Sequence, residues 1–286
     1  MVEKEESKKQ ATVEVEEYET DEKAVLDAKK DTLKPDELDE EKIEQDSVKK
    51  RQMQQLEKWH PKTELGKKIK SGEITDIDEI FRSGQRILEV EIIDTLFPNI
   101  ESELLMIGQS KGKFGGGARR VFKQTQKKTK EGNKPSFATI AVVGNKDGYV
   151  GIGYGKAKET VPAREKALSN AKLNLFQIKR GSGSWLSSTT DPHSIPFAVS
   201  GKCGSVKITL MPAPVGKGLV IEKECRKILQ LAGIKDIWSN SSGHTKTKIN
   251  LIKACISALR KLNVYKVSSE KEKELSIITG NKRQSD

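Results

Sequence analysis

Glycine occupies alternate positions of a short apolar stretch, Tyr149–Lys156, and this alternation limits the folds that the chain can adopt. The run before it, Ser136–Gly144, is β-branched and apolar and predicts a strand, and Asn145–Gly148 favours a tight hairpin turn. Side chains alternate between the two faces of a strand, so the glycines of the second strand share one face. A face without Cβ atoms suits the close approach of another backbone. These glycines are Gly151, Gly153 and Gly155.

The segment after the two strands predicts a helix that continues to Arg180. Thr160 can cap its N-terminus, and Pro162 falls in the first turn, where the missing N–H costs little. An apolar stripe at helical spacing predicts the buried side, and the cations fall mostly off this stripe. The stripe consists of Ala167, Leu168, Ala171, Leu175 and Ile178.

The charge of the chain is unevenly distributed. The 286 residues carry a net charge of +11, but residues 1–50 hold 10 basic and 18 acidic residues, a net charge of −8. The remainder therefore carries +19, which predicts a polyanionic partner. A membrane surface is less suitable, because we find no basic amphipathic helix with a hydrophobic face and no apolar run of about 20 residues.

The two ends of the chain are charged and predict no core of their own. Residues 1–58 form an extension that we expect to be disordered or an isolated helix; an acidic tail that shields the basic body before assembly is the alternative. Residues 59–100 predict short helices, one of them capped by Thr75, and residues 268–286 predict a flexible tail. The three cysteines have no zinc-ligand spacing and cannot all pair, which indicates a reducing cytoplasm.

The most basic part of the chain is the stretch from Ser110 to Pro135, which follows a candidate strand at Leu104–Gly108. Its only acid is Glu131, and the glycines near its start, Gly112 and Gly115–Gly117, let backbone N–H groups approach phosphates. A solvated hairpin tip is the alternative interpretation. The cations are Lys111, Lys113, Arg119, Arg120, Lys123, Lys127, Lys128, Lys130 and Lys134.

The second half of the chain predicts a two-layer sandwich of order ββαβα over residues 185–267. Gly181–Ser184 reads as a short flexible joint before it. The elements that we expect are strands at His193–Val199 and Ser205–Met211, a helix at Leu219–Ala232 that ends at Gly233, a strand at Ile234–Ser239 and a helix at Lys246–Leu262.

Six ordered motifs resemble the small-subunit ribosomal protein S-five family, and the Gly-Ser-Trp and Pro-His-Ser-Ile-Pro-Phe stretches resemble its archaeal branch. The resemblance covers about Trp59 to Val267. The motifs read "VVGNKDGYVGIGYGKAKETVPAREKALSNAKLNL", "GSW…PHSIPF", "GKCGSVKITLMPAP", "GKGLV", "LQLAGIKDIWS" and "KTKINLIKA". The segment "WHPKTELGKKIKSGEITDIDEIF" is also similar, and by resemblance it wraps the first domain. The basic loop and the strands and helix at 101–180 resemble a double-stranded RNA-binding domain, a three-stranded antiparallel sheet plus a helix, so the fold class is α+β.

The resemblance implies a structural protein of the small ribosomal subunit, cytoplasmic and ribosome-bound, with no enzymatic activity, cofactor or metal. It implies binding to rRNA near the decoding centre and the path by which mRNA enters, support of translational accuracy and subunit assembly, and contacts with mRNA and with small-subunit proteins four and eight. In this interpretation RNA approaches the glycine face. The expected RNA-binding residues are Lys111, Lys113, Arg119, Arg120, Lys123, Lys127, Lys128, Gly151, Gly153, Gly155, Lys156, Arg164, Lys179, Arg180 and Lys217.

Two other functions remain open at this stage, a free-standing double-stranded RNA-binding protein and a degenerate small-molecule kinase. Gly151–Lys156 fits neither the Walker spacing nor the dinucleotide fingerprint. Pro212–Leu219 resembles a kinase phosphate loop but lacks the serines after the glycines; it suits an RNA phosphate at a helix start equally well. Among single residues, we expect His193 to be structural, His244 to lie in a turn, and Trp185 to pack at the interdomain joint rather than to stack on a base.

Overall fold

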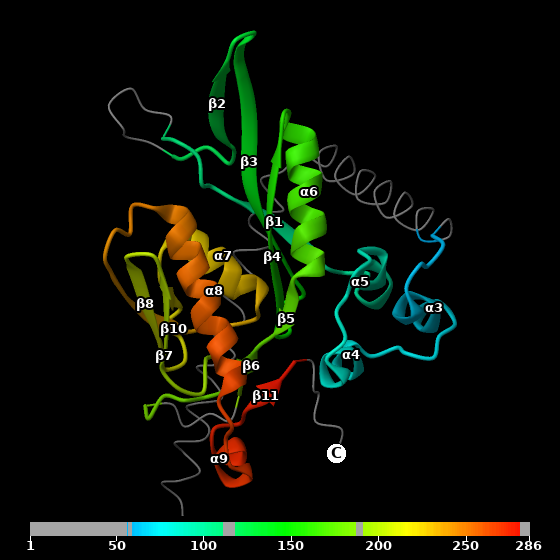
Figure 1. Cartoon of the computed structure of the whole chain (residues 1–286). Helices are drawn as coiled ribbons and strands as arrows, with labels where there is room; N and C mark the ends of the chain where they lie inside the picture. Colours follow the sequence, from blue (N-terminus) through cyan, green and yellow to red (C-terminus); the bar gives the residue numbers. More distant parts are fainter. Residues whose placement is uncertain (1–55, 57–58, 111–117, 187–190, 281–286) are drawn as a thin grey trace, which may run out of the picture. The chain divides into compact units, whose positions relative to one another are not determined.

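The computed structural model describes residues 56, 59–110, 118–186 and 191–280 of the chain (Figure 1). Residues 61–280 belong to one compact unit, and the account below concerns this unit. The predicted extension at 1–58 lies almost entirely outside the described residues, and so do the last six residues of the chain.

The N-terminal half of the unit is a five-stranded antiparallel sheet with helix α6 (Thr160–Leu173) on one face (Figure 1). The sheet has the order β1-β3-β4-β5, and β2 pairs with the outer part of β3. This arrangement confirms the α+β class and adds two strands to the expected three. The strands are β1 (Glu101–Leu105), β2 (Lys123–Thr129), β3 (Gly132–Gly144), β4 (Tyr149–Ala157) and β5 (Leu175–Gln177).

Helix α6 is shorter than the sequence pattern predicts. It ends at Leu173, and the chain then forms β5, which pairs with Tyr149–Gly151 of β4. Leu175 and Ile178 are buried as expected, but from a strand and the segment after it. Apolar residues at helical spacing predict which residues are buried, but the same residues can be buried from a strand. Here the edge of β4 is available for pairing, so Leu175 lies in a strand although the spacing predicts a helix.

The C-terminal half contains a four-stranded sheet of order β7-β8-β10-β9 and the helices α7 and α8. The expected order ββαβα holds, with the short β9 added before α7. The first strand lies later than the sequence predicts, because the hairpin turns at Gly204, where φ is +61°. The elements are β7 (Val199–Cys203), β8 (Val206–Pro212), β9 (Leu219–Val220), α7 (Lys223–Leu231), β10 (Ile237–Ser242) and α8 (Lys248–Val264).

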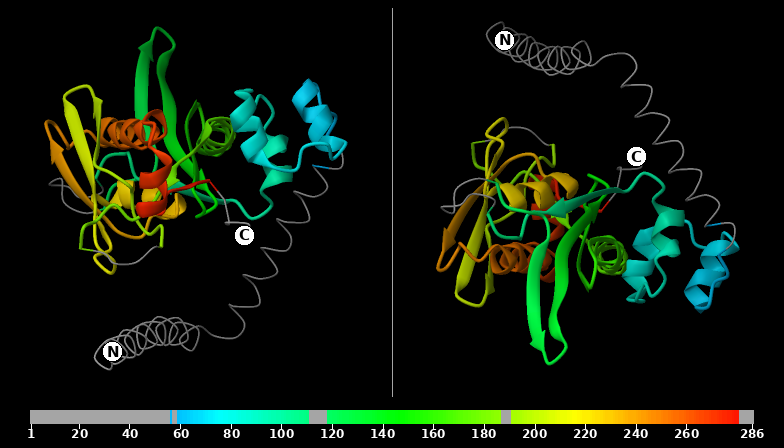
Figure 2. Two further views of the ribbon diagram at one scale, coloured as in Figure 1. Left: turned by 90° about the horizontal axis from the view of Figure 1, so that it is seen from below. Right: turned by 90° about the horizontal axis from the view of Figure 1, so that it is seen from above.

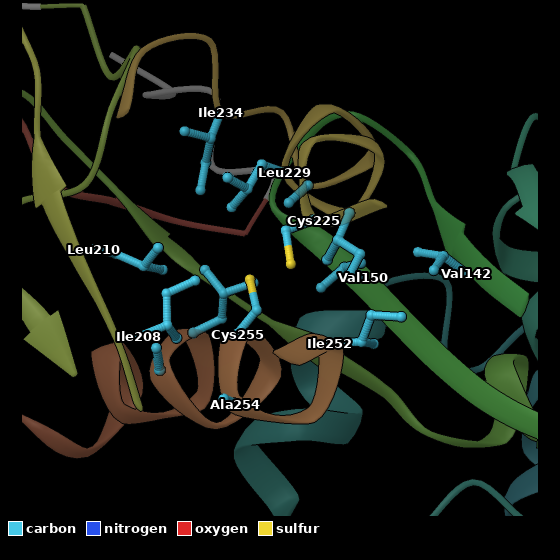
Figure 3. Close-up of a cluster of buried hydrophobic side chains, with 14 of the residues drawn as sticks. Val142, Val150, Ile208, Leu210, Cys225, Leu229, Ile234, Ile252, Ala254 and Cys255 are labelled. Atoms are coloured by element: carbon cyan, nitrogen blue, oxygen red, sulfur yellow. The ribbon is translucent and has the colours of Figure 1, made fainter. Parts of the chain in front are cut away.

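The two halves share one hydrophobic core. The face of the first sheet that points away from α6 contributes Val142 and Val150, which pack in one cluster with Leu229 of α7 and Ile252 of α8 (Figure 3). The sheet is therefore enclosed by helices from both halves of the chain, which restricts independent movement of the halves.

Three short helices precede the first sheet and pack against it. Asp78 accepts hydrogen bonds from the Tyr149 hydroxyl and, at 2.9 Å, from the Gln177 amide, while Asp94 pairs with Lys172 of α6 at 2.5 Å. The ring of Tyr149 lies between Phe81 and Phe97, whose centroids are 6.1 and 5.2 Å away. The helices are α3 (Glu64–Lys70), α4 (Ile77–Ser83) and α5 (Glu91–Leu96). The N-cap of α4 is Asp76, one residue after the predicted Thr75.

The joint and the C-terminal segment were both predicted to be flexible, and both predictions are wrong for the described residues. Gly181 forms a β-bridge with Ser194, and a Cβ on Gly183 would lie 2.5 Å from the carbonyl carbon of Pro196. The Ser182 N–H donates to the Leu275 carbonyl at 2.8 Å. The segment after residue 268 forms α9 (Ser269–Glu274) and then β11 (Ile278–Thr279), which pairs with β6 (Lys179–Arg180).

Candidate nucleic-acid interface

Strands β2 and β3 form a long hairpin that carries most of the basic stretch. All residues of β2 except Thr129 are exposed, and in both views of Figure 2 this ribbon projects away from α7 and α8. The sequence predicted a loop here, but part of it is strand. Paired strands place the lysines at fixed spacings, which a loop would not.

The hairpin brings like charges together. Lys127 stands directly opposite Lys134 in the register, and Glu131 offsets one of them through a 2.9 Å ion pair with Lys134. Like charges directly opposite each other on two strands destabilise a hairpin. A polyanion that neutralises them removes this cost, so the cluster favours a polyanionic ligand. The exposed lysines of the hairpin are Lys123, Lys127, Lys128, Lys130 and Lys134.

Two arginines lie at the base of the hairpin and differ in their roles. The guanidinium of Arg119 donates to the carbonyls of Gly108 and Lys246, each at 3.4 Å, so it fastens the segment to the fold. The backbone of Arg120 is hydrogen-bonded to Gly108 and Gln109, and its side chain is exposed. Lys111 and Lys113, which were also predicted to bind RNA, lie outside the described residues.

The glycine face of β4 does not receive RNA, and this part of the prediction is wrong. All three glycines are buried under α6, whose small residues Ala163, Ala167 and Ala171 pack onto them. A Cβ on Gly153 would lie 2.6 Å from the carbonyl carbon of Asn170 and closer still to backbone atoms of Ala167 and Ala171. The backbone that approaches Gly151, Gly153 and Gly155 is that of the chain's own helix.

The remaining predicted cations fall into two groups. Lys156 at the end of β4 and Arg164 on α6 are exposed. Lys179 donates to the Tyr265 carbonyl at 2.9 Å, and Arg180 donates to the Gly280 carbonyl at 3.3 Å. Burial lowers the pKa of the Arg180 guanidinium from its usual value, and nearby Asp147 opposes this shift. The Arg180 side chain is partly buried and stabilises the fold, so the prediction that it contacts RNA is wrong.

Carboxylates of the chain itself occupy the N–H groups of the segment Pro212–Leu219 and of the start of α7. Asp236 accepts the Gly218 N–H at 2.7 Å, and Glu222 caps α7 by accepting the N–H groups of Glu224 and Cys225. An RNA or nucleotide phosphate at this helix start would have to displace Glu222, so both phosphate-loop interpretations are disfavoured. Lys217 itself is exposed on the loop.

The single-residue expectations had different outcomes. His193 is buried, with its ring nitrogens 2.9 Å from the Asp191 carbonyl and 3.2 Å from the Ala213 carbonyl, which confirms a structural role. His244 is exposed just after β10. Trp185 is 90% exposed, so the prediction that it packs at the joint is wrong, and base stacking remains the untested alternative.

The described part of the chain provides no evidence of a metal or redox centre. No group of three or more potential metal ligands occurs among these residues. The buried thiols of Cys225 and Cys255 are hydrogen-bonded to each other, which together with burial raises the pKa of Cys225 (Figure 3). A raised thiol pKa disfavours the reactive thiolate. Within the same residues, no helix has the length and apolar character required to cross a bilayer.

Sequence reasoning missed a second group of cations, on α8. Lys253, Arg260 and Lys261 are exposed, and they line a cavity between α8 and the first sheet. Positions 253 and 260 are seven residues apart, which places them on one side of a helix. This spacing is present in the sequence, but the apolar stripe on the opposite side predicts only the buried face of the helix.

Comparison with known proteins agrees with the fold. The family model described as "Ribosomal protein S5, N-terminal domain" matches residues 121–179, and "Ribosomal protein S5, C-terminal domain" matches residues 201–273.

Curated relatives include archaeal proteins named "Small ribosomal subunit protein uS5". The one from Nanoarchaeum equitans is 48% identical over 215 residues, which cover 75% of this chain and 92% of the relative. The relative from Methanobrevibacter smithii is 44% identical, and the match covers 78% of this chain and 97% of the relative. The relative from Pyrobaculum islandicum is also 44% identical, and the match covers 74% of this chain and 98% of the relative. Because the relatives are matched over nearly their whole length, the chain belongs to the uS5 family of small ribosomal subunit proteins.

Proposed function

We propose that this chain binds rRNA of the small ribosomal subunit chiefly through the exposed lysines of the β2–β3 hairpin. The observation that supports the proposal is the cross-strand pair Lys127 and Lys134 on a hairpin whose strand β2 is exposed at every residue except Thr129. Hairpin lysines can follow a phosphate backbone without reading its sequence, since phosphate contacts fix position and carry no direct base information.

Membership of the uS5 family makes the chain a structural, non-enzymatic constituent of the small subunit, located with the ribosome in the cytoplasm. We further propose the finer assignments that the family resemblance implies. The protein lies near the decoding centre and the path by which mRNA enters, contacts small-subunit proteins four and eight, and supports accuracy and assembly. Arg120, Lys156, Arg164 and Lys217 remain candidate RNA contacts because their side chains are exposed.

The hairpin proposal predicts a specific salt dependence. Each phosphate neutralised on a duplex contributes about −0.9 to the slope of log affinity against log salt. Changing Lys123, Lys127, Lys128 and Lys130 to Ala should therefore flatten the slope by roughly 3.6 and weaken binding similarly for duplexes of different sequence. The measurement is filter binding of the full chain to a helical rRNA fragment at several salt concentrations.

A control variant separates local contacts from net charge. Lys202, Lys207, Lys235 and Lys271 are exposed lysines outside the hairpin, and their change to Ala removes the same charge. This control should retain most of the slope. Equal slopes for the two variants would show that the hairpin is a solvated tip and would refute the proposal.

A further inference from the structure

The face of β4 opposite the glycines borders a cavity of about 560 Å³. Because side chains alternate along the strand, Ile152, Tyr154 and Lys156 share this face. Helix α8 forms the other wall. The cavity is lined by Ile140, Ile152, Tyr154, Asn174, Ile252, Lys253, Ile256, Ser257, Arg260, Lys261 and Val264.

The lining combines an apolar floor with an exposed aromatic ring. Ile140 and Ile252 are buried and belong to the shared core, and Ile152 and Ile256 pack against it. Tyr154 stands at the rim with 47% of its surface exposed. The volume lies within the range of about 300–1,000 Å³ that small-molecule sites occupy, so one nucleotide can enter.

The charged residues of the lining are all cationic. Arg260 holds its guanidinium 5.0 Å from the centroid of the Phe176 ring, which fixes the orientation of this group. Lys261 donates to the Ser200 carbonyl at 2.7 Å. Lys253 is exposed on α8, and no carboxylate occurs among the described lining residues. The cavity is thus complementary to an anionic ligand with a flat apolar part.

The sheet connects this cavity with the hairpin. In the register, Ala138 stands between Lys123 on β2 and Lys156 on β4, and residues paired in this way share a face. Tyr154, two residues before Lys156 on β4, lies on the same face and lines the cavity. In the opposite direction, toward the tip of the hairpin, Lys127 and Lys134 also lie on this face. One line of cations therefore runs from the hairpin to the aromatic rim.

We propose that this cavity, the α8 groove, binds an unpaired nucleotide of single-stranded RNA, with the base against Tyr154 and the phosphates near Lys253 and Lys156. The inference rests on the proposed function, because it deepens rRNA binding by adding a site for single strands. Aromatic rings and cations along one groove are the features with which proteins bind single strands irrespective of sequence. An apolar protein segment would give the cations of the wall no anionic partner, so RNA fits the lining better.

The test is binding of a short single-stranded oligouridylate to the full chain, compared with an RNA duplex. Stacking on one aromatic residue contributes about 1–3 kcal/mol by alanine substitution, so Tyr154→Ala should weaken oligouridylate binding by about five- to 150-fold. Duplex affinity should change by less than about twofold. Tyr154→Phe should restore binding, and Lys253→Ala should flatten the single-strand salt slope by about 0.7.

The outcomes separate the groove from the hairpin. If Tyr154→Ala and Lys253→Ala both leave oligouridylate affinity and its salt slope unchanged, the groove proposal fails, whatever the hairpin variant does. If the four-lysine hairpin variant keeps its duplex affinity while Tyr154→Ala loses the single strand, the hairpin proposal fails alone. Lys202→Ala, a change of one exposed lysine on β7, is the matched control and should have no effect.

A second experiment examines the assembled particle. Ser257, which lines the groove, is replaced by a photoreactive amino acid in the full chain. Small subunits are then reconstituted with this variant. Cross-linking to an unpaired rRNA nucleotide supports the proposal. Cross-linking only to a neighbouring protein would assign the groove to a protein contact and overturn it.

Discussion

Gly153→Val should unfold or severely destabilise the protein rather than merely obstruct a partner. The added Cβ would overlap backbone atoms of Ala167 and Ala171 and would lie 2.6 Å from the carbonyl carbon of Asn170. Both sides of this contact are backbone, one in a central strand and one in a helix, so no side-chain rotation relieves the clash. Overpacking costs about 1–3 kcal/mol where a core can adjust, and we expect more than about 3 kcal/mol here.

Urea denaturation followed by circular dichroism measures this loss. Tyr154→Val is the matched control, because it places the same β-branched residue at the next position of β4 on the half-exposed opposite face. The control should change the free energy of unfolding by less than about 1.5 kcal/mol. A folded Gly153→Val protein of normal stability that fails to bind RNA would contradict the packing shown by the structure.

The glycine face of β4 could be predicted from the sequence, but the backbone that packs on it could not. Alternation correctly predicted a face without Cβ atoms and a close backbone approach. It could not say which backbone approaches, because the alanines that complete the contact lie in α6, between eight residues (Gly155 to Ala163) and 20 residues (Gly151 to Ala171) later in the chain. The apolar stripe at helical spacing includes two of these alanines, Ala167 and Ala171, but indicates only that they are buried. Ala163, Ala167 and Ala171 recur at a spacing of four, so the small-residue match between helix and strand was present in the sequence.

The basic hairpin and the α8 groove differ in how much the sequence revealed. Charge density alone indicated the basic stretch as a candidate RNA-binding surface, because its lysines are close together in the chain. The groove is composed of Tyr154 and α8 residues about 100 positions later, and composition cannot reveal such a meeting. The prediction of a flexible C-terminal segment is wrong for a related reason. The segment is mostly charged, and its two strand residues, Ile278 and Thr279, pair with β6, which is about 100 positions earlier in the chain.

Removal of residues 268–286 should also destabilise the whole protein. The deletion eliminates the pairing of Ile278 and Thr279 with β6 and leaves the Ser182 N–H without the Leu275 carbonyl that it donates to at 2.8 Å. The partly buried Arg180 also loses its acceptor at Gly280. Hydrogen bonds contribute about 1 kcal/mol each, and buried groups left without a partner cost about 1–3 kcal/mol, so we expect a total loss of about 3–5 kcal/mol.

The measurement is the urea midpoint of the truncated protein against the full chain, with the Lys271→Ala and Lys273→Ala double variant as control. That variant removes two charges from α9 but retains the backbone ladder to β6, so it should denature like the unaltered protein. An unchanged midpoint after truncation would mean that the segment contributes no net stability and that the joint at Gly181 holds without it. A large shift would explain why Lys179 and Arg180, basic as they are, serve the fold: their strand is the surface on which the end of the chain docks.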